Sequence, residues 1–215
     1  MSFSSDLPQQ ICDIHRQLYH LGFSVGNDGN SSARINPDEM WITPAGLEKS
    51  KLHPKQICRI SIKDGKLLEG DCDPSTEWRM HAQIYIQNPY LQAIVHSHPP
   101  YAIACSLSEI SLEEPILPEV IVSLGPVPTC AYTCPGTDEI ANQVGSSLQE
   151  HKAVILERHG VVAAGLTLDH AFSDVQRVEH AARILLLAHS TGRQAKVLSA
   201  TQHQELLKLK DSSQT

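Results

Sequence analysis

Two histidines separated by one residue, His96 and His98, close an apolar stretch of this sequence. The preceding Ala-Ile-Val at 93–95 has the character of a buried strand, and the two prolines that follow cannot continue a sheet. Side chains two apart in a strand share one face, so both imidazoles are expected to converge where the strand ends. Imidazoles placed this way can bind a divalent cation, although two ordinary histidines at a strand end would give the same pattern.

A third histidine, His159, follows another apolar stretch, Ala-Val-Ile-Leu at 153–156, and precedes a glycine. Three protein ligands leave a position open for water or substrate, as in catalytic zinc sites. His96, His98 and His159 together therefore predict a metal site. The six cysteines form no Cys-x-x-Cys pair, so they indicate reduced thiols rather than a thiolate zinc site.

Strand and helix patterns alternate along the chain, and the elements that they predict must position these histidines. Helices are expected at 6–22, from 75 or 76 to 87, and at 101–107, 137–148 and 167–190, with a short one in the tail. Strands are expected at 32–35, 40–42, 57–62, 66–68, 91–98, 119–122, 126–130, 153–156 and 161–164. This order predicts an α/β sandwich in a single domain over residues 1–215, with a core at about 8–190 and a C-terminal tail at about 196–215.

The composition is that of an ordinary globular protein and excludes several classes of partner. The 215 residues are 41% hydrophobic, and the net charge is −7, with a pI near 5.9. An acidic chain argues against a nucleic-acid surface and against a basic membrane patch. No apolar stretch approaches the ~18 residues that span a bilayer, and the first residues lack the pattern of a signal peptide. We therefore expect a cytoplasmic location, with no nucleic-acid or membrane partner.

Three further stretches have the chemistry of an anion site. The loop at 26–32 and the turn Thr-Pro-Ala-Gly at 43–46 are dense in small residues, which can present backbone N–H groups to an anion. Ser75 or Thr76 can cap the next helix, and Glu77 is expected in its first turn, where the helix dipole stabilises a carboxylate. Taken alone, such a stretch is more typical of a plain turn or an ordinary helix start.

Five motifs of this chain occur in the same order in the class II aldolase/adducin family. They are Gly-Asn-Asp-Gly-Asn-Ser-Ser, Ile-Thr-Pro-Ala-Gly, Pro-Ser-Thr-Glu-Trp-x-x-His, Val-His-x-His and Arg-His-Gly-Val-x-x-x-Gly. Over about residues 8–190 the chain resembles this family, most closely the L-fuculose-phosphate aldolase-like sugar-phosphate aldolases. The resemblance implies a three-layer α/β/α sandwich with a mainly antiparallel central sheet. It also implies a homotetramer with active sites between subunits.

The resemblance also assigns roles to individual residues. His96, His98 and His159 match zinc ligands, with Mn²⁺ or another divalent cation as alternatives, and Glu77 matches the catalytic carboxylate. A substrate phosphate is implied to bind at the small residues of the two loops and the helix start: Asn27, Asn30, Ala45, Gly46, Ser75 and Thr76.

The reaction implied is that of a metal-dependent aldolase. It cleaves a ketose 1-phosphate reversibly to dihydroxyacetone phosphate and an aldehyde through a metal-stabilised enediolate. Two related reactions remain open: dehydration of methylthioribulose 1-phosphate and 4-epimerisation of a pentulose 5-phosphate. A non-enzymatic, adducin-like scaffold domain is the alternative from another class, but the retained histidines and Glu77 argue against it.

Glu119 stands at a position of special interest for the reaction. A tyrosine stands near here in fuculose-phosphate aldolase and acts on the oxygen of the departing aldehyde, whereas the related methylthioribulose-phosphate dehydratases have a glutamate. We therefore expect Glu119 to be a second catalytic group, with a surface carboxylate at a strand start as the alternative. The glutamate also puts L-fuculose phosphate itself in doubt as the substrate.

Overall fold

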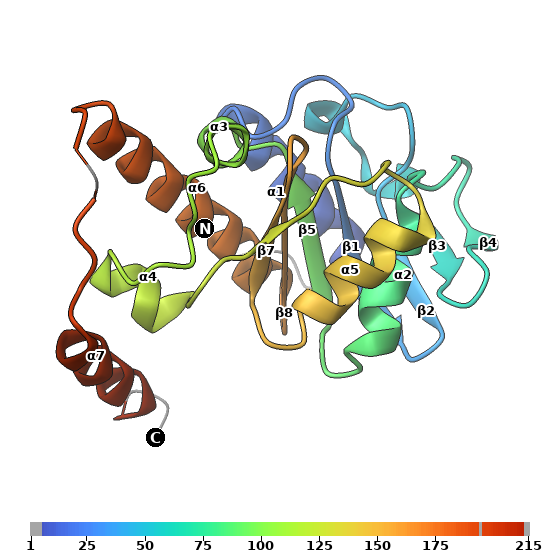
Figure 1. The fold of residues 1–215 in the computed structure, drawn as a ribbon. Helices are drawn as coiled ribbons and strands as arrows, with labels where there is room; N and C mark the ends of the chain where they lie inside the picture. The colour runs from blue at the N-terminus through green and yellow to red at the C-terminus, as the bar shows by residue number, and fades with distance from the viewer. Residues whose placement is uncertain (1–5, 194, 213–215) are drawn as a thin grey trace.

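The computed structural model describes residues 6–193 and 195–212, and these form one eight-stranded sheet with helices around it (Figure 1). The strands lie in the order β4-β3-β2-β1-β5-β8-β7-β6. Every neighbouring pair is antiparallel except β6 and β7. The predicted α/β fold with a mainly antiparallel sheet is thus confirmed. The strands are β1 (Asn30–Asn36), β2 (Glu39–Ile42), β3 (Cys58–Ser61), β4 (Leu67–Glu69), β5 (Ala93–Ser97), β6 (Thr129–Cys130), β7 (Ala153–Leu156) and β8 (Gly160–Gly165).

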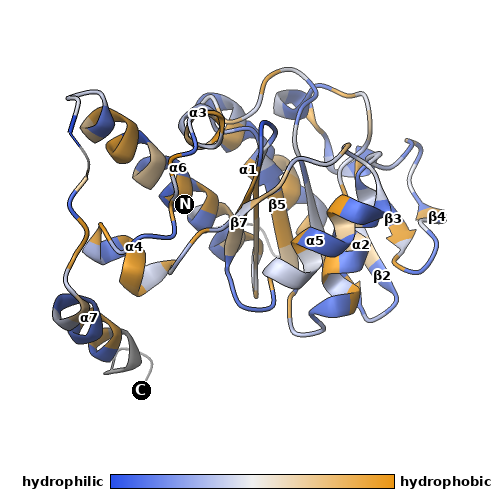
Figure 2. Ribbon diagram, viewed as in Figure 1, coloured by the Kyte–Doolittle hydropathy of each residue, from blue (hydrophilic) through white to orange (hydrophobic). Residues whose placement is uncertain are grey.

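Helices cover both faces of the sheet because the central strands bury apolar side chains on both sides. In β5, Ala93 and Val95 join the core beneath α1, α3 and α6, whereas Ile94 joins the core beneath α2 and α5. β5 is accordingly orange in Figure 2, while α2 and α5 carry both orange and blue stretches. These helices are α1 (Leu7–His20), α2 (Trp78–Gln87), α3 (Pro100–Leu107), α5 (Asp138–Ser147) and α6 (Leu168–His189).

The last helix, α7 (Ala200–Ser212), lies beside the short helix α4 (Pro118–Ser123) at one end of the molecule (Figure 1). The predicted helix in the tail is thus confirmed, and the polar end expected after it, residues 213–215, lies outside the described residues. None of the helices that the described residues form is long and apolar enough to cross a membrane.

Three sequence-based expectations about elements were wrong. Residues 119–122 form the middle of helix α4 instead of a strand, because Pro118 suits a first helical turn and the Ile121 N–H bonds back to the Leu117 carbonyl oxygen at 3.1 Å. The strand expected at 126–130 is reduced to the two residues of β6. Helix α2 begins at Trp78, so Glu77 occupies the N-cap position rather than the first turn.

Candidate active site

The three histidines of the sequence prediction meet at one edge of the sheet. His96 lies in β5, His98 follows it directly, and His159 lies in the turn between β7 and β8. Their ring centroids are 4.8 to 5.0 Å apart, and their candidate ligand nitrogens all lie within 4.8 Å of one another. Since β5 and β8 are antiparallel neighbours, the end of one strand and the start of the other meet at this edge. The group can hold a single metal ion.

The turn between β7 and β8 brings His159 close to the end of β5. At Gly160, a side chain would place its first carbon 2.4 Å from the carbonyl oxygen of Ser97, a contact that only glycine avoids. Arg158 adopts a left-handed conformation with φ of 63°, and its N–H donates to the Ser106 hydroxyl at 3.0 Å. A non-glycine residue held in this region stores strain, of the order of 1 kcal/mol, and such strain often occurs at functional sites.

The imidazoles are electrically suited to a cation. His96 Nδ1 donates to the carbonyl oxygen of Val161 at 3.0 Å, which leaves the lone pair of Nε2 directed at the other two rings. Burial, acting together with the neighbouring imidazoles, lowers the pKa of both His96 and His98 to about 3. These two rings are therefore neutral near pH 7, as metal ligands must be. The donor set fits zinc and other divalent cations that accept nitrogen ligands.

Glu77 lies beside the three histidines. Its Oε2 is 3.4 Å from His96 Nε2, and its Oε1 is 3.9 Å from His159 Nε2. The side-chain amide of Asn30 donates to Oε2 at 2.6 Å. A carboxylate held in this way can exchange a proton with a substrate that binds next to the cluster.

His81, one turn further along α2, fixes Asn30. Its ring is fully buried, and its two nitrogens lie 2.6 Å from Asn30 Oδ1 and 2.7 Å from Ser32 Oγ. Because the Asn30 nitrogen donates to Glu77, its oxygen accepts, so His81 Nε2 donates and Nδ1 accepts from the Ser32 hydroxyl. Burial lowers the pKa of His81 to about 3, which keeps the ring neutral for this pattern. His81 is the histidine that ends the motif Pro-Ser-Thr-Glu-Trp-x-x-His, to which the sequence analysis assigned no role.

The residues predicted to bind phosphate surround a hollow next to the histidines. The turn at Gly46 has a φ of +69°, and open space lies where a side chain would be, so its backbone faces the hollow. Ser75 accepts the N–H of Glu77 at 3.3 Å, beside the first turn of α2. The hollow is lined by all six predicted phosphate residues and by three of the predicted catalytic and metal residues: Asn27, Asn30, Ala45, Gly46, Ser75, Thr76, Glu77, His98 and His159.

Two charged residues that the sequence analysis did not single out also line this hollow. Asp28 lies with its Oδ2 3.7 Å from His98 Nδ1, and its place in the glycine-rich loop was a usable signal. Lys49 is only 2% exposed, and its Nζ donates to the carbonyl oxygen of Pro44 at 2.6 Å. No motif marked Lys49, because its burial arises from the folding of two loops around it.

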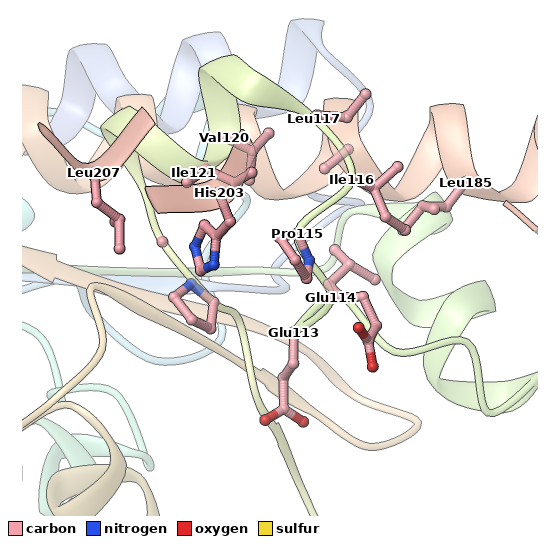
Figure 3. A pocket seen from close by; sticks show the side chains of 14 residues that line it. Glu113, Glu114, Pro115, Ile116, Leu117, Val120, Ile121, Leu185, His203 and Leu207 are labelled. Atoms are coloured by element: carbon pink, nitrogen blue, oxygen red, sulfur yellow. The ribbon is translucent and has the colours of Figure 1, made fainter. Parts of the chain in front are cut away.

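Glu119 is not brought to the histidines within one chain. It lies on α4 and lines a separate hollow with Arg177 and His180 of α6. A third hollow, largely apolar, lies between α4, α6 and α7 (Figure 3), and no residue of the predicted site is among the described residues that line it. The catalytic role of Glu119 stays a prediction.

Comparison with known proteins decides the family. A family model for the class II aldolase and adducin N-terminal domain matches residues 9–186. The chain belongs to the class II aldolase and adducin family. The family predicted from the sequence is thereby confirmed.

Individual relatives of this family member catalyse different reactions. A 3-oxo-tetronate 4-phosphate decarboxylase of Haemophilus influenzae is 31% identical over 210 residues, 94% of this chain and 97% of the relative. An L-fuculose phosphate aldolase of Escherichia coli is 33% identical over 195 residues, 90% of this chain and 88% of the relative. A solved L-fuculose 1-phosphate aldolase structure has a TM-score of 0.85 at 29% identity, covering 95% of this chain and 96% of that one.

Proposed function

We propose that this protein is a metal-dependent lyase that cleaves a carbon–carbon bond beside the ketone of a sugar phosphate and releases dihydroxyacetone phosphate. The observation that carries the proposal is the place of Glu77, between the three histidines and a hollow lined by small, loop-forming residues. In the first candidate reaction, a ketose 1-phosphate is cleaved to dihydroxyacetone phosphate and an aldehyde. The similarity to L-fuculose phosphate aldolase supports it.

His96, His98 and His159 would hold the cation, with zinc as the first expectation and Mn²⁺ as an alternative. The bound cation would act as a Lewis acid that stabilises negative charge on the substrate oxygens. Asn27, Asn30, Ala45, Gly46, Ser75 and Thr76 would hold the phosphate and so fix the position of the reacting carbons.

Proton transfers complete the cleavage. A base removes the proton from the hydroxyl that becomes the aldehyde oxygen, the carbon–carbon bond breaks, and its electron pair forms an enediolate. Glu77, which enters the reaction in its protonated form, then delivers that proton to the enediolate carbon, which yields dihydroxyacetone phosphate. Glu119 is the base in this proposal. Since it lies away from the histidines of its own chain, we assign it to the site of a neighbouring subunit in a homotetramer.

Decarboxylation of a four-carbon 3-oxo acid 4-phosphate is the second candidate, which the sequence analysis had not considered. The similarity to the Haemophilus influenzae decarboxylase supports it. Loss of CO₂ from the carbon next to the ketone leaves the same enediolate, which Glu77 would again protonate. This reaction needs no base at a departing aldehyde, so Glu119 would be dispensable.

Product analysis of the zinc-loaded protein tests the proposal. A panel of ketose 1-phosphates and the 3-oxo acid 4-phosphate should include one substrate that yields dihydroxyacetone phosphate, with an aldehyde or CO₂ as the second product. The His159→Ala variant should lose both metal and activity because a third ligand is removed. Absence of dihydroxyacetone phosphate from every substrate, or wild-type metal content in His159→Ala, would contradict it.

A further inference from the structure

Lys49 is a buried cation that ties together two loops of the candidate active site. Its backbone N–H donates to the Gly26 carbonyl oxygen at 3.0 Å, and its Nζ donates to the Pro44 carbonyl oxygen at 2.6 Å. The first bond holds the loop that carries Asn27, and the second holds the turn that carries Gly46. Both loops line the hollow, and so does Lys49. Its ammonium group is therefore placed at the wall of the proposed phosphate site.

The charge of Lys49 has no close partner among the described residues. An ammonium group has three N–H donors, and the bond to Pro44 uses one. None of the carboxylates described in the structure forms an ion pair with Nζ within 4.0 Å. Buried lysines are ordinarily paired, because an ammonium removed from water loses its hydration. A negative charge bound next to the ammonium group of Lys49 would therefore stabilise it.

Apart from the metal ion proposed at the histidines, the positive charge that could balance an anion in this hollow comes, among the described residues, from Lys49. Asp28 and Glu77 are its two acidic residues among those described, and Lys49 is its one lysine or arginine. Neutral backbone N–H groups and hydroxyls can orient a phosphate, but they do not balance two negative charges beside two carboxylates.

We propose that Lys49 is a substrate-binding residue that supplies the countercharge for a doubly negative phosphate group. The proposal rests on the phosphate site of the proposed function and adds its charge selectivity. The bound group is a dianion, a phosphate monoester, rather than a carboxylate or a neutral hydroxyl-rich chain. Lys49 acts as a cation and forms no covalent bond to the substrate.

The pKa of Lys49 gives the proposal a second readout. Burial lowers its pKa to about 8, with Asp28 acting in the opposite direction. The other titratable groups that interact with it are Cys58 on β3, whose pKa burial raises to about 11, and His15 on α1, whose pKa burial lowers to about 3. Neither changes charge between pH 7 and pH 9. A loss of anion affinity in this range that the Lys49→Met variant does not show would therefore report on Lys49.

Calorimetric titration of sulfate into the metal-loaded protein tests the proposal, because sulfate is a dianion throughout this pH range. At pH 7, Lys49→Met should weaken sulfate binding by ~10-fold or more. Lys51→Met is the matched control, since Lys51 lies on the same short turn but is exposed and pairs with Glu48. It should leave sulfate binding unchanged. Wild-type affinity in a folded Lys49→Met variant would overturn the proposal.

The wild-type protein provides a test that does not depend on the folding of a variant. Lys49 loses its positive charge as the pH rises through its pKa, so sulfate affinity should be constant near pH 7 and fall by up to about tenfold per pH unit above pH 8. A flat profile to pH 9.5 would overturn the role of Lys49. Complete absence of sulfate binding at pH 7 would instead contradict the proposed phosphate site, and with it the proposed function.

A separate experiment distinguishes a covalent role of Lys49 from its proposed role as a countercharge. A buried lysine of lowered pKa can form a Schiff base with a ketone. Borohydride reduction in the presence of dihydroxyacetone phosphate should leave Lys49 without an added mass in peptide mass spectrometry. A reduced adduct on Lys49 would overturn the assignment as a countercharge.

Discussion

The carboxylate of Glu77 is oriented through a relay of buried polar side chains. Asn30 donates to Glu77, His81 donates to Asn30, and Ser32 donates to His81. The Tyr85 hydroxyl lies 2.9 Å from Ser32 Oγ and extends the relay into the core. Each member restricts the orientation of the next, so a change at His81 acts on Glu77 without contact between them.

We predict that His81→Leu lowers activity while the metal stays bound. The variant leaves the Asn30 oxygen without its donor, so the amide can rotate and Glu77 loses its fixed position. Because a buried acceptor becomes unsatisfied, the free energy of unfolding should also fall by ~1–3 kcal/mol. The measurements are kcat, metal content and the denaturation midpoint. An unchanged kcat in the folded, metal-loaded variant would show that the relay does not serve catalysis.

The histidine cluster could be predicted from the sequence, whereas Lys49 and the relay could not. His96, His98 and His159 lie at or just after the ends of apolar strands, and strand periodicity fixes where residues at such positions point. Lys49 becomes buried when the loop at Gly26, more than 20 residues earlier in the sequence, folds against the turn that carries it. The role of His81 depends on Asn30, 51 residues earlier in the chain. Contacts of this kind leave no local pattern in the sequence.

At the level of elements, the position of His98 depends on how helix α3 begins. The N–H groups of Tyr101 and Ala102, in the first turn of α3, both donate to the carboxylate of Glu179 on α6, at 3.0 and 2.8 Å. A carboxylate at a helix N-terminus satisfies two otherwise unpaired donors and is stabilised by the helix dipole. Since α3 begins two residues after His98, Glu179 anchors the chain just beyond that histidine of the cluster.

We predict that Glu179→Gln weakens metal binding by ~10-fold, comparable with the loss of an outer partner of a ligand. The carboxylate of Glu179 accepts from both backbone N–H groups, whereas the amide of glutamine has one acceptor oxygen and an NH₂ group that repels the second N–H. The start of α3 would therefore be held less firmly, and so would His98 just before it. Titration of zinc into the apoprotein, together with the visible spectrum of the cobalt-loaded protein, measures the effect.

Asp174→Asn is the control for Glu179→Gln. Asp174 is equally buried, on the same helix, and burial raises its pKa as it raises the pKa of Glu179. It pairs with Arg177 instead of α3. Asp174→Asn should therefore reduce stability without a change in zinc affinity. Equal zinc affinities for the two variants would mean that Glu179 is only a structural residue.

The error at α4 can be traced to a conflict between local propensity and tertiary packing. Val-Ile-Val after Glu119 is a strong strand signal, because β-branched residues favour strands. Pro118 can begin either element, and the sequence alone did not distinguish the two. The helix forms at the edge of the molecule, where α4 packs on α7 and Ile121 is its one buried residue among those described. The strand propensity of these residues is overridden by packing of α4 against α7, which begins about 80 residues further along the chain.

At the level of the whole molecule, the proposed catalytic groups are divided between two regions. Glu77 lies at the histidine edge of the sheet, whereas Glu119 lines a hollow between α4 and α6. A closed cyclic assembly can bring such regions together, because each subunit presents one surface to one neighbour and a different surface to the other. The proposed tetramer would then contain four sites, each with Glu77 from one subunit and Glu119 from the next.

We predict that two impaired variants, Glu77→Gln and Glu119→Gln, restore activity to each other when they assemble in the same tetramer. Glu77→Gln alone should be inactive, and Glu119→Gln alone should be slower in aldol cleavage by ~10²–10⁴-fold. In mixed tetramers made by co-expression, a site is intact when a subunit that keeps Glu77 is followed by one that keeps Glu119. With random order in equal amounts, about a quarter of the sites meet this condition, so the mixture should recover about a quarter of wild-type activity.

The control for this experiment is a mixture of Glu77→Gln with His159→Ala. Both changes fall in the same half of the site, so no arrangement of these subunits restores it, and the mixture should stay inactive. If Glu119→Gln with Glu77→Gln is equally inactive, each site is complete within one chain and the neighbouring-subunit role of Glu119 is wrong. If Glu119→Gln alone retains full activity and the products include CO₂, the enzyme is the decarboxylase of the second candidate, because only aldol cleavage requires a base at the departing aldehyde oxygen.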